Sequence, residues 1–287
     1  MTTIALTATT GMLGQMAYRV LRERFDLVLL YRDEAKLRLL DGAADHRLVK
    51  VDYADLFRAF VADGTAALDG LVERIGDVDA VLNTAGVIIP RMRDAPELTF
   101  FVNGALPHLL AAHYGPKLIH ITTDCVYSGR DGAPYDECAP PSPKDLYGMS
   151  KAMGEPTARS LVLRTSIIGP ELAGHASLLE WLRSRRGEIV DGYTNHFWNG
   201  LTTKALAECV ATIVADRGAH PATGGYHLFS TAVSKEELLR MLDKRYDLGV
   251  TVRPREVQPV DRRLATVHGL NAALRVPPLD AMLDALP

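Results

Sequence analysis

The chain has few cysteines, no long apolar run and no excess of one charge. Its three cysteines, at positions 125, 138 and 209, are too few and too scattered for a disulfide framework or a zinc cage. No apolar run approaches the ~20 residues of a membrane span, and the N-terminus lacks the pattern of a signal peptide. The formal net charge of −3 gives no electrostatic indication of nucleic-acid or acidic-lipid binding. We therefore expect a soluble, cytoplasmic protein that binds neither nucleic acid nor membrane.

The apolar pattern of the 287 residues alternates between strand-like runs and helical spacing. Runs of strand length occur at residues 4–7, 26–31, 47–51, 78–82, 118–122 and 161–164. Stretches with helical spacing lie between them, for example at residues 56–71 and 100–113. Short strands separated by helices are typical of βαβ units, whose parallel sheet is covered on both faces. The sequence predicts an α/β fold with a doubly wound parallel sheet, the Rossmann arrangement.

The pattern changes after about residue 165, where Pro and Gly become frequent. Amphipathic or strand-like segments occur at residues 177–185, 203–214, 226–229 and 234–242. The last of these begins with Ser234 and has Glu237 three residues on, which is the spacing of a capping box. We predict a dinucleotide-binding domain at residues 1–165 and a smaller, interleaved substrate-binding lobe at residues 166–287. Segments near residues 201–230 are expected to return to the first domain.

A glycine turn connects the first predicted strand to the first predicted helix. Gly11 lets the backbone approach a pyrophosphate, whose charge the helix N-terminus then meets. Gly14 lets the helix pack closely on the strand. The most frequent dinucleotide pattern has a further glycine three residues before Gly11, and Ala8 occupies that position. Two glycines in a strand-turn-helix are a weak signal, so an ordinary turn remains the alternative.

Arg32 follows the second predicted strand, where the adenosine ribose of a bound dinucleotide would lie. An acidic residue at this point favours NAD, whereas the planar guanidinium of an arginine suits a 2′-phosphate. Lys36 is close enough in the sequence to assist. The pattern favours NADP(H) over NAD(H) as cofactor, and a solvated surface charge is the alternative.

Three residues carry the predicted chemistry. Thr123 follows the fifth predicted strand, while Tyr147 and Lys151 share one face of a helical segment because they are four residues apart. A phenol has a pKa of about 10 and becomes a better acid when a cation lies beside it. Tyr147 would then protonate a developing alkoxide as hydride arrives, and Thr123 would hold the same oxygen. A Tyr-x-x-x-Lys pattern alone has little meaning. Here it follows the glycine turn and a strand that ends in Thr-Thr-Asp, and this order of motifs favours a catalytic role.

The order of these motifs resembles the extended short-chain dehydrogenase/reductases, and most closely their dTDP-4-dehydrorhamnose reductase-like branch of nucleotide-sugar 4-ketoreductases. The similarity runs nearly from end to end. The passages that carry it are residues 9–14 (TTGMLG), 83–86 (NTAG), 120–129 (HITTDCVYSG), 146–151 (LYGMSK), 154–155 (GE) and 163–169 (LRTSIIG). The resemblance implies Thr123, Tyr147 and Lys151 as catalytic residues. It also implies a cofactor site formed by Gly11, Met12, Leu13, Gly14, Asp52, Tyr53, Thr84, Ala85, Gly86 and Lys151, with Asn103 as support of the active-site helix. Thr10 and Arg32 are added to the predicted cofactor residues by their places beside the glycine turn and after the second strand.

The predicted substrate contacts are less specific. They are Arg91, Asp124, Cys125, Ser166, His196, Trp198 and Asn199. The family pattern Arg-Thr-Ser-Trp appears here as Arg-Thr-Ser-Ile at residues 164–167, so Trp198 is the candidate for the aromatic wall beside the sugar. Arg93, Arg185 and Arg186 are further candidates for a nucleotide diphosphate, although each is more often a solvated charge.

The type of residue after Asp124 differs between related enzymes and therefore helps to distinguish their activities. Nucleotide-sugar 4,6-dehydratases that resemble this family have a glutamate there, and Cys125 cannot replace it in the same way. Epimerase-reductases that make GDP-fucose have a cysteine at the matching position, paired with a distal histidine. His175 lies near the expected partner position but does not align with it. A small buried residue beside the active site is the other interpretation of Cys125.

The sequence thus predicts an NADPH-dependent oxidoreductase that reduces a 4-keto-6-deoxy nucleotide sugar, with no metal. One alternative is a bifunctional epimerase-reductase that uses Cys125. Another, from a different class, is a non-catalytic NADP-binding regulatory subunit, because fold alone does not establish chemistry. The sugar, the nucleotide and the oligomeric state, a homodimer included, are left open.

Overall fold

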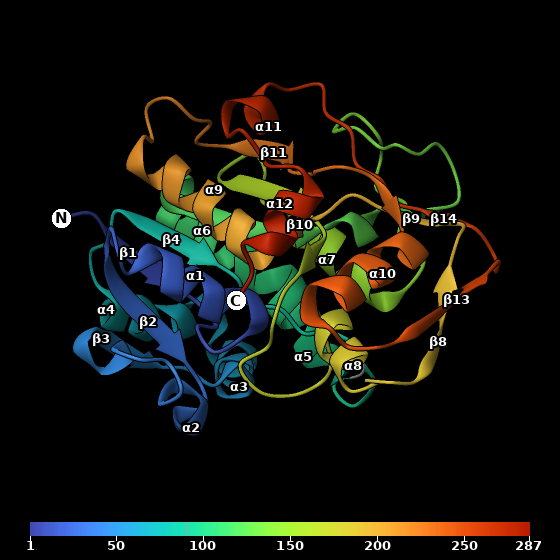
Figure 1. The fold of residues 1–287 in the computed structure, drawn as a ribbon. Coiled ribbons are helices and arrows are strands. Elements are labelled where there is room, and N and C mark those ends of the chain that lie inside the picture. The colour runs from blue at the N-terminus through green and yellow to red at the C-terminus, as the bar shows by residue number, and fades with distance from the viewer. Residues whose placement is uncertain (90) are drawn as a thin grey trace.

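A parallel sheet forms the centre of the molecule (Figure 1). In the computed structural model, which describes residues 1–89 and 91–287, this sheet has seven strands in the order β3-β2-β1-β4-β5-β6-β11. Its strands are β1 (Thr3–Leu6), β2 (Asp26–Tyr31), β3 (Arg47–Lys50), β4 (Ala80–Asn83), β5 (Leu118–Thr123), β6 (Leu161–Thr165) and β11 (Gly224–His227). All neighbouring strands pair in parallel. The predicted doubly wound α/β fold is therefore confirmed.

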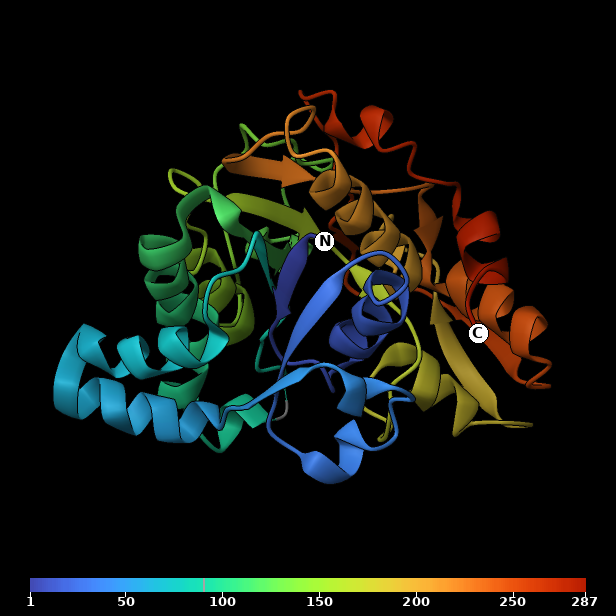
Figure 2. The same ribbon diagram turned by 90° about the vertical axis from the view of Figure 1, so that its left-hand side faces the viewer.

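Both faces of the sheet are covered, which explains the continuous apolar runs of the strands. Ile4 and Leu6 of β1 point to one side and Ala5 to the other, and each side has its own apolar cluster. Helices α1 (Met12–Leu21) and α9 (Thr203–Ala215) pack against each other on the first side. Helices α3 (Tyr53–Asp63), α4 (Asp69–Ile75) and α6 (Leu106–Tyr114) cover the second side (Figure 2).

The direction in which strands are added reverses at β1, which lies between β2 and β4. In open α/β sheets, ligands bind at such a switch point, outside the carboxyl ends of the strands. The fold thus places the glycine turn after β1, the loop after β4 and the end of β5 around one crevice.

Two predicted helices differ in detail from the structure. The stretch at residues 56–71 is interrupted because Gly64 has a φ of +62°, a value that ends α3 and that glycine adopts without strain. The stretch at residues 100–113 contains a π turn, Phe101–Ala105, between α5 (Pro96–Phe100) and α6. Such turns are frequent at functional sites, and this one carries Asn103.

The last third of the chain contributes to both parts of the molecule. Strand β11 pairs with β6 in the main sheet, and small sheets pair β7 with β10, β8 with β13, and β9 with β12 and β14. These strands are β7 (Ile167–Ile168), β8 (Ile189–Tyr193), β9 (His196–Trp198), β10 (Leu201–Thr202), β12 (Val233–Ser234), β13 (Thr251–Arg255) and β14 (Val260–Asp261). The α-helices of the whole molecule that have not yet been named are α2 (Glu34–Leu37), α7 (Leu146–Met153), α8 (Leu178–Arg183), α10 (Lys235–Tyr246), α11 (Leu270–Ala273) and α12 (Leu279–Asp284).

The capping box predicted at the start of α10 is confirmed, since Glu237 N donates to Ser234 Oγ and Ser234 N donates to the Glu237 carboxylate. Among the described residues, no helix combines the length and the apolarity that crossing a bilayer requires.

Candidate active site

A cleft of about 720 Å³ lies at the carboxyl ends of the strands. It extends from the end of β2 past the glycine turn to β5 and α7. Its size is that of an ordinary ligand site. The predicted cofactor and catalytic residues on its wall are Thr10, Gly11, Met12, Leu13, Arg32, Tyr53, Thr84, Gly86, Thr123, Tyr147 and Lys151. Asp124, Cys125 and Ser166, predicted as substrate contacts, line it too.

The glycine turn has the close packing that its sequence predicts. Gly11 N donates to Ala8 O at 2.9 Å, which closes the turn. A Cβ at Gly14 would lie 2.2 Å from the same carbonyl oxygen, so this position has no room for a side chain. The first turn of α1 is therefore held against β1, with its N-terminus at the cleft.

Ala8 adopts a backbone conformation that favours glycine. Its φ is +48°, in the left-handed region, and its side chain lines the cleft. An alanine in this conformation is strained by roughly 1–2 kcal/mol relative to the right-handed region.

We expect Ala8→Gly to raise the free energy of unfolding by about 1 kcal/mol, because glycine adopts a positive φ without the clash of Cβ. Thermal unfolding would show a melting temperature about 2 °C higher. Ala112→Gly, at an exposed position of α6, is the matched control and should lower stability by about 1 kcal/mol. A destabilised Ala8→Gly variant would contradict the assigned backbone strain.

The loop after β4 is held by the buried hydroxyl of Thr7, the residue that follows β1. Thr7 Oγ1 donates to Asn83 Oδ1 at 2.8 Å and accepts from Thr84 N at 3.0 Å and from Ala85 N at 3.2 Å. Ala85 is buried behind the cleft wall. Asp52 also has a structural role, because its carboxylate caps the N-terminus of α3 by accepting from Ala54 N at 2.7 Å.

Asn103 connects this loop to α7. Its side chain accepts from Val87 N at 2.8 Å and donates to Val87 O at 2.9 Å. It also donates to Ser150 Oγ at 3.0 Å, on the helix that carries Tyr147 and Lys151. Asn103 is fully buried, so it supports the cleft from behind and is not part of its surface.

The three residues predicted as catalytic face one cleft. Asp145 caps α7 by accepting from Gly148 N at 2.7 Å, and this fixes the first turn, where Tyr147 lies. Lys151 Nζ lies 3.5 Å from Ala85 O. Thr123 Oγ1 donates to Asp124 Oδ1 at 3.1 Å. The phenol and the ammonium thus share a helix face, with the hydroxyl on the strand end beside them.

Burial sets the charge states of these groups. It raises the pKa of Tyr147 above its ordinary value, with a further contribution from Cys125 and an opposing one from the hydrogen bond of Thr123. The phenol therefore holds its proton at neutral pH. The lower pKa expected from the neighbouring Lys151 ammonium is not found, because burial dominates and raises the pKa. Burial lowers the pKa of Lys151 to about 8, against the opposing attraction of Glu155. Lys151 carries its charge below about pH 8 and loses it above.

Cys125 lies on the cleft wall, but its thiol is held in the protonated form. Burial, with the adjacent Asp124 carboxylate, raises the pKa of this thiol to about 12. A protonated thiol cannot act as a base at neutral pH. His175, although close in sequence to the cleft residues 171–174, is not part of the described cleft wall.

Other predicted substrate contacts lie off the cleft. Asn199 binds the backbone of Leu264 in both directions, at 2.8 and 2.9 Å, which joins β9 to a distant segment. Trp198 is buried and has the Lys235 ammonium over its ring, at 5.8 Å from the centroid. His196 Nε2 lies 2.9 Å from Gln258 O. None of these three is on the described cleft wall, and their contact with a substrate stays a prediction.

The predicted diphosphate-binding arginines whose side chains the structure describes do not line the cleft wall. Arg185 pairs with Glu188 at 3.3 Å, and Arg186 donates to Asp247 O at 2.8 Å. Neither of these two, nor Arg93, is on the described cleft wall. The side chain of Arg91 falls outside the part of the chain that the structure describes.

One part of the cleft was not predicted. This part of the wall comes from residues 171–174 and 176–178, around the start of α8. Gln15 of α1 fixes the start of this segment by donating to Pro170 O at 3.0 Å. Its end is capped by Ser177, which accepts from Glu180 N. The sequence held a signal for this end, since Ser177 and Glu180 have capping-box spacing.

Comparison with known proteins identifies the family of this chain. Residues 76–265 match the family model described as the RmlD substrate binding domain. A probable low-salt glycan biosynthesis reductase, Agl14, of Haloferax volcanii is 29% identical over 240 residues, which cover 78% of this chain and 73% of that protein. A dTDP-4-dehydrorhamnose reductase of Burkholderia thailandensis is 26% identical over 243 residues, or 79% and 72% of the two chains. The resemblance inferred from the motifs is thereby confirmed.

Solved structures share the fold. The dTDP-4-dehydrorhamnose reductase of Bacillus anthracis, in complex with NADP, aligns with a TM-score of 0.71 and 16% identity, over 100% of this chain and 98% of that one. DesIV of Streptomyces venezuelae, a dTDP-glucose 4,6-dehydratase with NAD and TYD bound, aligns with a TM-score of 0.69 and 18% identity, over 99% and 95%.

Proposed function

Given that the chain belongs to the RmlD substrate binding domain family, we propose that it is an NADPH-dependent reductase of a 4-keto-6-deoxy nucleotide sugar. The observation that carries this proposal is the placement of Thr123, Tyr147 and Lys151 on the same cleft wall as the glycine turn. Relatives named as reductases of dTDP-linked keto sugars support the substrate class. In this proposal, residues 1–165 bind the dinucleotide and residues 166–287 bind most of the sugar nucleotide.

The residues present fit a nicotinamide dinucleotide. Gly11 and Gly14 bring the backbone and the α1 N-terminus to the cleft, as a pyrophosphate requires. Gly86 lies opposite Lys151, where an added Cβ would be 3.0 Å from Nζ, so this glycine keeps the space beside the ammonium open. When bound, the reduced cofactor supplies the hydride.

The chain's own residues supply the proton and the orientation. Tyr147, protonated at neutral pH, donates its proton to the oxygen of the keto group as negative charge develops there. Thr123 donates a second hydrogen bond to the same oxygen, for which its hydroxyl proton turns away from Asp124 Oδ1, and fixes the position of this oxygen. Lys151, charged below about pH 8, holds positive charge beside the phenol and stabilises the tyrosinate that remains.

The preference for NADPH rests on two basic side chains at the adenosine end of the cleft. Arg32 and Lys36 line this end, and neither makes a side-chain hydrogen bond or ion pair to the residues that the structure describes. The nearby carboxylate of Asp33 is occupied, since it caps α2 by accepting from Lys36 N at 3.1 Å. Arg32 and Lys36 are therefore available to a 2′-phosphate.

We expect Arg32→Ala to raise the KM for NADPH about tenfold or more and to change the KM for NADH less than threefold, because a charged hydrogen bond to the 2′-phosphate contributes about 1.5–3 kcal/mol. Steady-state kinetics with both cofactors measure this. Arg38→Ala is the matched control, because Arg38 at the end of α2 is an arginine close to Arg32 in the chain that pairs with Glu34 and does not line the described cleft wall. Equal losses for the two cofactors would remove the argument for NADPH.

The function itself is tested by mixing the purified protein with NADPH and each of the dTDP-, UDP-, GDP- and CDP-linked 4-keto-6-deoxy sugars, and by following the nicotinamide absorbance. We expect oxidation of NADPH with at least one sugar. Binding of NADPH without oxidation by any of them would favour the regulatory subunit. Solvent deuterium at C3 or C5 of the product would favour the epimerase-reductase, whereas a reductase incorporates none at these carbons.

A further inference from the structure

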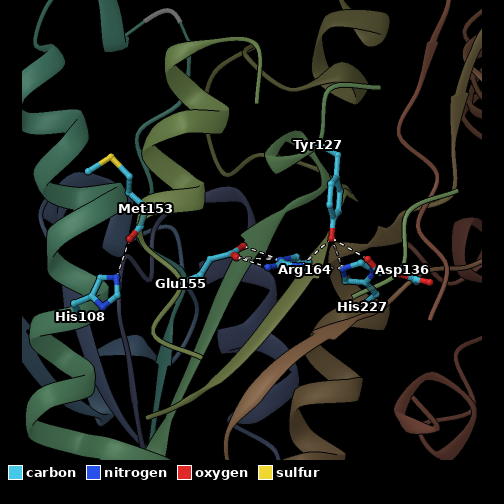
Figure 3. Close-up of polar contacts among 7 residues, drawn as sticks. All are labelled: His108, Tyr127, Asp136, Met153, Glu155, Arg164 and His227. Atoms are coloured by element: carbon cyan, nitrogen blue, oxygen red, sulfur yellow. Dashed lines mark hydrogen bonds and ion pairs between the residues drawn. The ribbon is translucent and has the colours of Figure 1, made fainter. Parts of the chain in front are cut away.

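One buried guanidinium joins three segments of the molecule (Figure 3). Arg164 of β6 donates to the Glu155 carboxylate through Nη2 at 2.6 Å and through Nε at 3.0 and 3.1 Å. Its third nitrogen, Nη1, donates to Tyr127 Oη at 2.8 Å. Glu155 lies two residues beyond the end of α7, and Tyr127 lies four residues beyond the end of β5. Neither of them, nor Arg164, lines the described cleft wall.

The residue that Arg164 holds in the loop after β5 is a buried phenol. Tyr127 is fully buried, and its ring stacks on that of Tyr135 with 4.5 Å between the ring centroids. Besides accepting from Arg164, its hydroxyl donates to Asp136 O at 3.1 Å and lies 3.1 Å from His227 Nε2. The side chain of Tyr127 is thus held from several sides, which fixes the loop at this residue.

Tyr127 and Thr123 close the two ends of one short turn. Residues Asp124–Val126 form a single 3₁₀ turn, and Tyr127 N closes its end by donating to Asp124 O at 3.0 Å. Thr123 Oγ1 caps its start by accepting from Cys125 N at 3.2 Å. This bond fixes the rotamer of Thr123 and uses only an acceptor site of its hydroxyl, so the proton stays available for donation. A shift of Tyr127 therefore reaches the Thr123 hydroxyl through one turn of the backbone.

An arginine is suited to this connection because its donors lie in one rigid plane. The guanidinium that binds Glu155 with two nitrogens binds Tyr127 with the third, so the two partners cannot shift independently. A buried ion pair alone is a poor source of stability, and an apolar pair would anchor the segment after α7 equally well. What an apolar pair lacks is the directed hydrogen bond to the loop.

Resting on the proposed function, we infer that Arg164 and Tyr127 are positioning residues for the reduction. Arg164 holds the Tyr127 hydroxyl, and Tyr127 holds the turn from which Thr123 presents its hydroxyl to the keto oxygen. Because Arg164 also binds Glu155, the turn keeps a fixed place relative to α7, which carries Tyr147. Neither Arg164 nor Tyr127 touches substrate or cofactor in this role, and both act through Thr123.

We expect Tyr127→Phe to lower kcat about tenfold and to change the Kd for NADPH less than twofold, because small misplacements of reacting groups reduce the rate. In a Thr123→Ala background, Tyr127→Phe should lower kcat less than twofold further, because the hydroxyl that it positions is already absent. Steady-state turnover of the four proteins completes this double-mutant cycle. A role of Tyr127 in stability alone would lower kcat by the same factor in both backgrounds.

Tyr18→Phe is the matched control. Tyr18 of α1 is also buried, and its hydroxyl likewise accepts from an arginine, Arg22 Nη1 at 3.1 Å, and donates to a backbone carbonyl, Asp41 O at 2.7 Å. It does not line the described cleft wall. Tyr18→Phe and Tyr127→Phe should lower the melting temperature to a similar extent, but Tyr18→Phe should keep kcat within twofold of the parent.

Amide hydrogen exchange, followed by NMR, tests the turn without any turnover. The N–H groups of Cys125 and Tyr127 donate the two bonds that close the turn. Both should exchange at least tenfold faster in Tyr127→Phe than in the parent, because the turn opens locally more often, whereas Tyr18→Phe should leave them unchanged. Arg164→Lys should act as Tyr127→Phe does, because a lysine keeps the charge beside Glu155 but lacks the planar fork that reaches both partners.

Unchanged exchange at Cys125 and Tyr127, or equal losses of kcat in the two backgrounds, would overturn the inference. If one of the variants Tyr127→Phe and Arg164→Lys fails to fold, the exchange rates of the other decide. The proposed reductase is refuted separately, by NADPH that binds but is not oxidised by any keto sugar. The exchange rates would then still decide whether Arg164 and Tyr127 hold the turn.

Discussion

Replacing Tyr147 by Phe should lower kcat for the reduction about 10³-fold while the Kd for NADPH changes less than twofold. The substitution removes one hydroxyl and keeps the ring that packs in the cleft, so only the proton donor is lost. General acid catalysis contributes typically 10²–10⁴-fold, and the thiol of Cys125, with a pKa of about 12, is a poor replacement. Steady-state turnover and a separate NADPH titration measure the two effects.

Tyr114→Phe is the matched control for this variant. The Tyr114 hydroxyl of α6 is also buried, and among the described residues it has no hydrogen-bond partner. Burial raises its pKa to about 12, so it is a protonated phenol like Tyr147 but lies outside the described cleft wall. Its loss should leave kcat within twofold of the parent. If Tyr147→Phe retained more than a tenth of the parent activity, the phenol would not be the proton donor.

The features that could be predicted from the sequence are those that depend on neighbouring residues. Each strand of the main sheet, the glycine turn and the capping box at Ser234 is formed by residues that are close together in the sequence. The structure confirms these elements. The spacing of Tyr147 and Lys151 is likewise local, and the helix periodicity places both on one face. The catalytic roles of these residues stay a prediction.

The features that could not be predicted depend on pairings between distant segments. Strand β8 pairs with β13, about 60 residues further on, and neither has the apolar run of a buried strand. Asn199 looked like a substrate contact because it stands in a glycine- and aromatic-rich stretch, but its side chain binds Leu264. Glu155 and Arg164 lay within the family motifs, yet their pairing follows from the position of β6 beside the end of α7. Local patterns identified the residue types, and the tertiary contacts decided their partners.

The close approach of α7 to the loop after β5 leads to the second large effect. Gly148 follows Tyr147, and a Cβ there would lie 2.3 Å from Cys125 O and 2.9 Å from Pro143 Cβ. The carbonyl belongs to the backbone beside Thr123 and Asp124 and cannot move without moving them. Gly148→Ala must therefore push the helix and the loop apart, and the phenol of Tyr147 and the hydroxyl of Thr123 separate.

We expect Gly148→Ala to lower kcat about 10²-fold, because small misplacements of reacting groups reduce the rate by such factors. Overpacking of this kind should also lower the free energy of unfolding by about 1–3 kcal/mol. Gly70→Ala is the matched control, since Gly70 of α4 is also helical and a Cβ there meets nothing within 4 Å. That variant should gain up to about 1 kcal/mol of stability and keep its activity. Full activity in a folded Gly148→Ala variant would show that the contact between α7 and the loop does not set the distance between Tyr147 and Thr123.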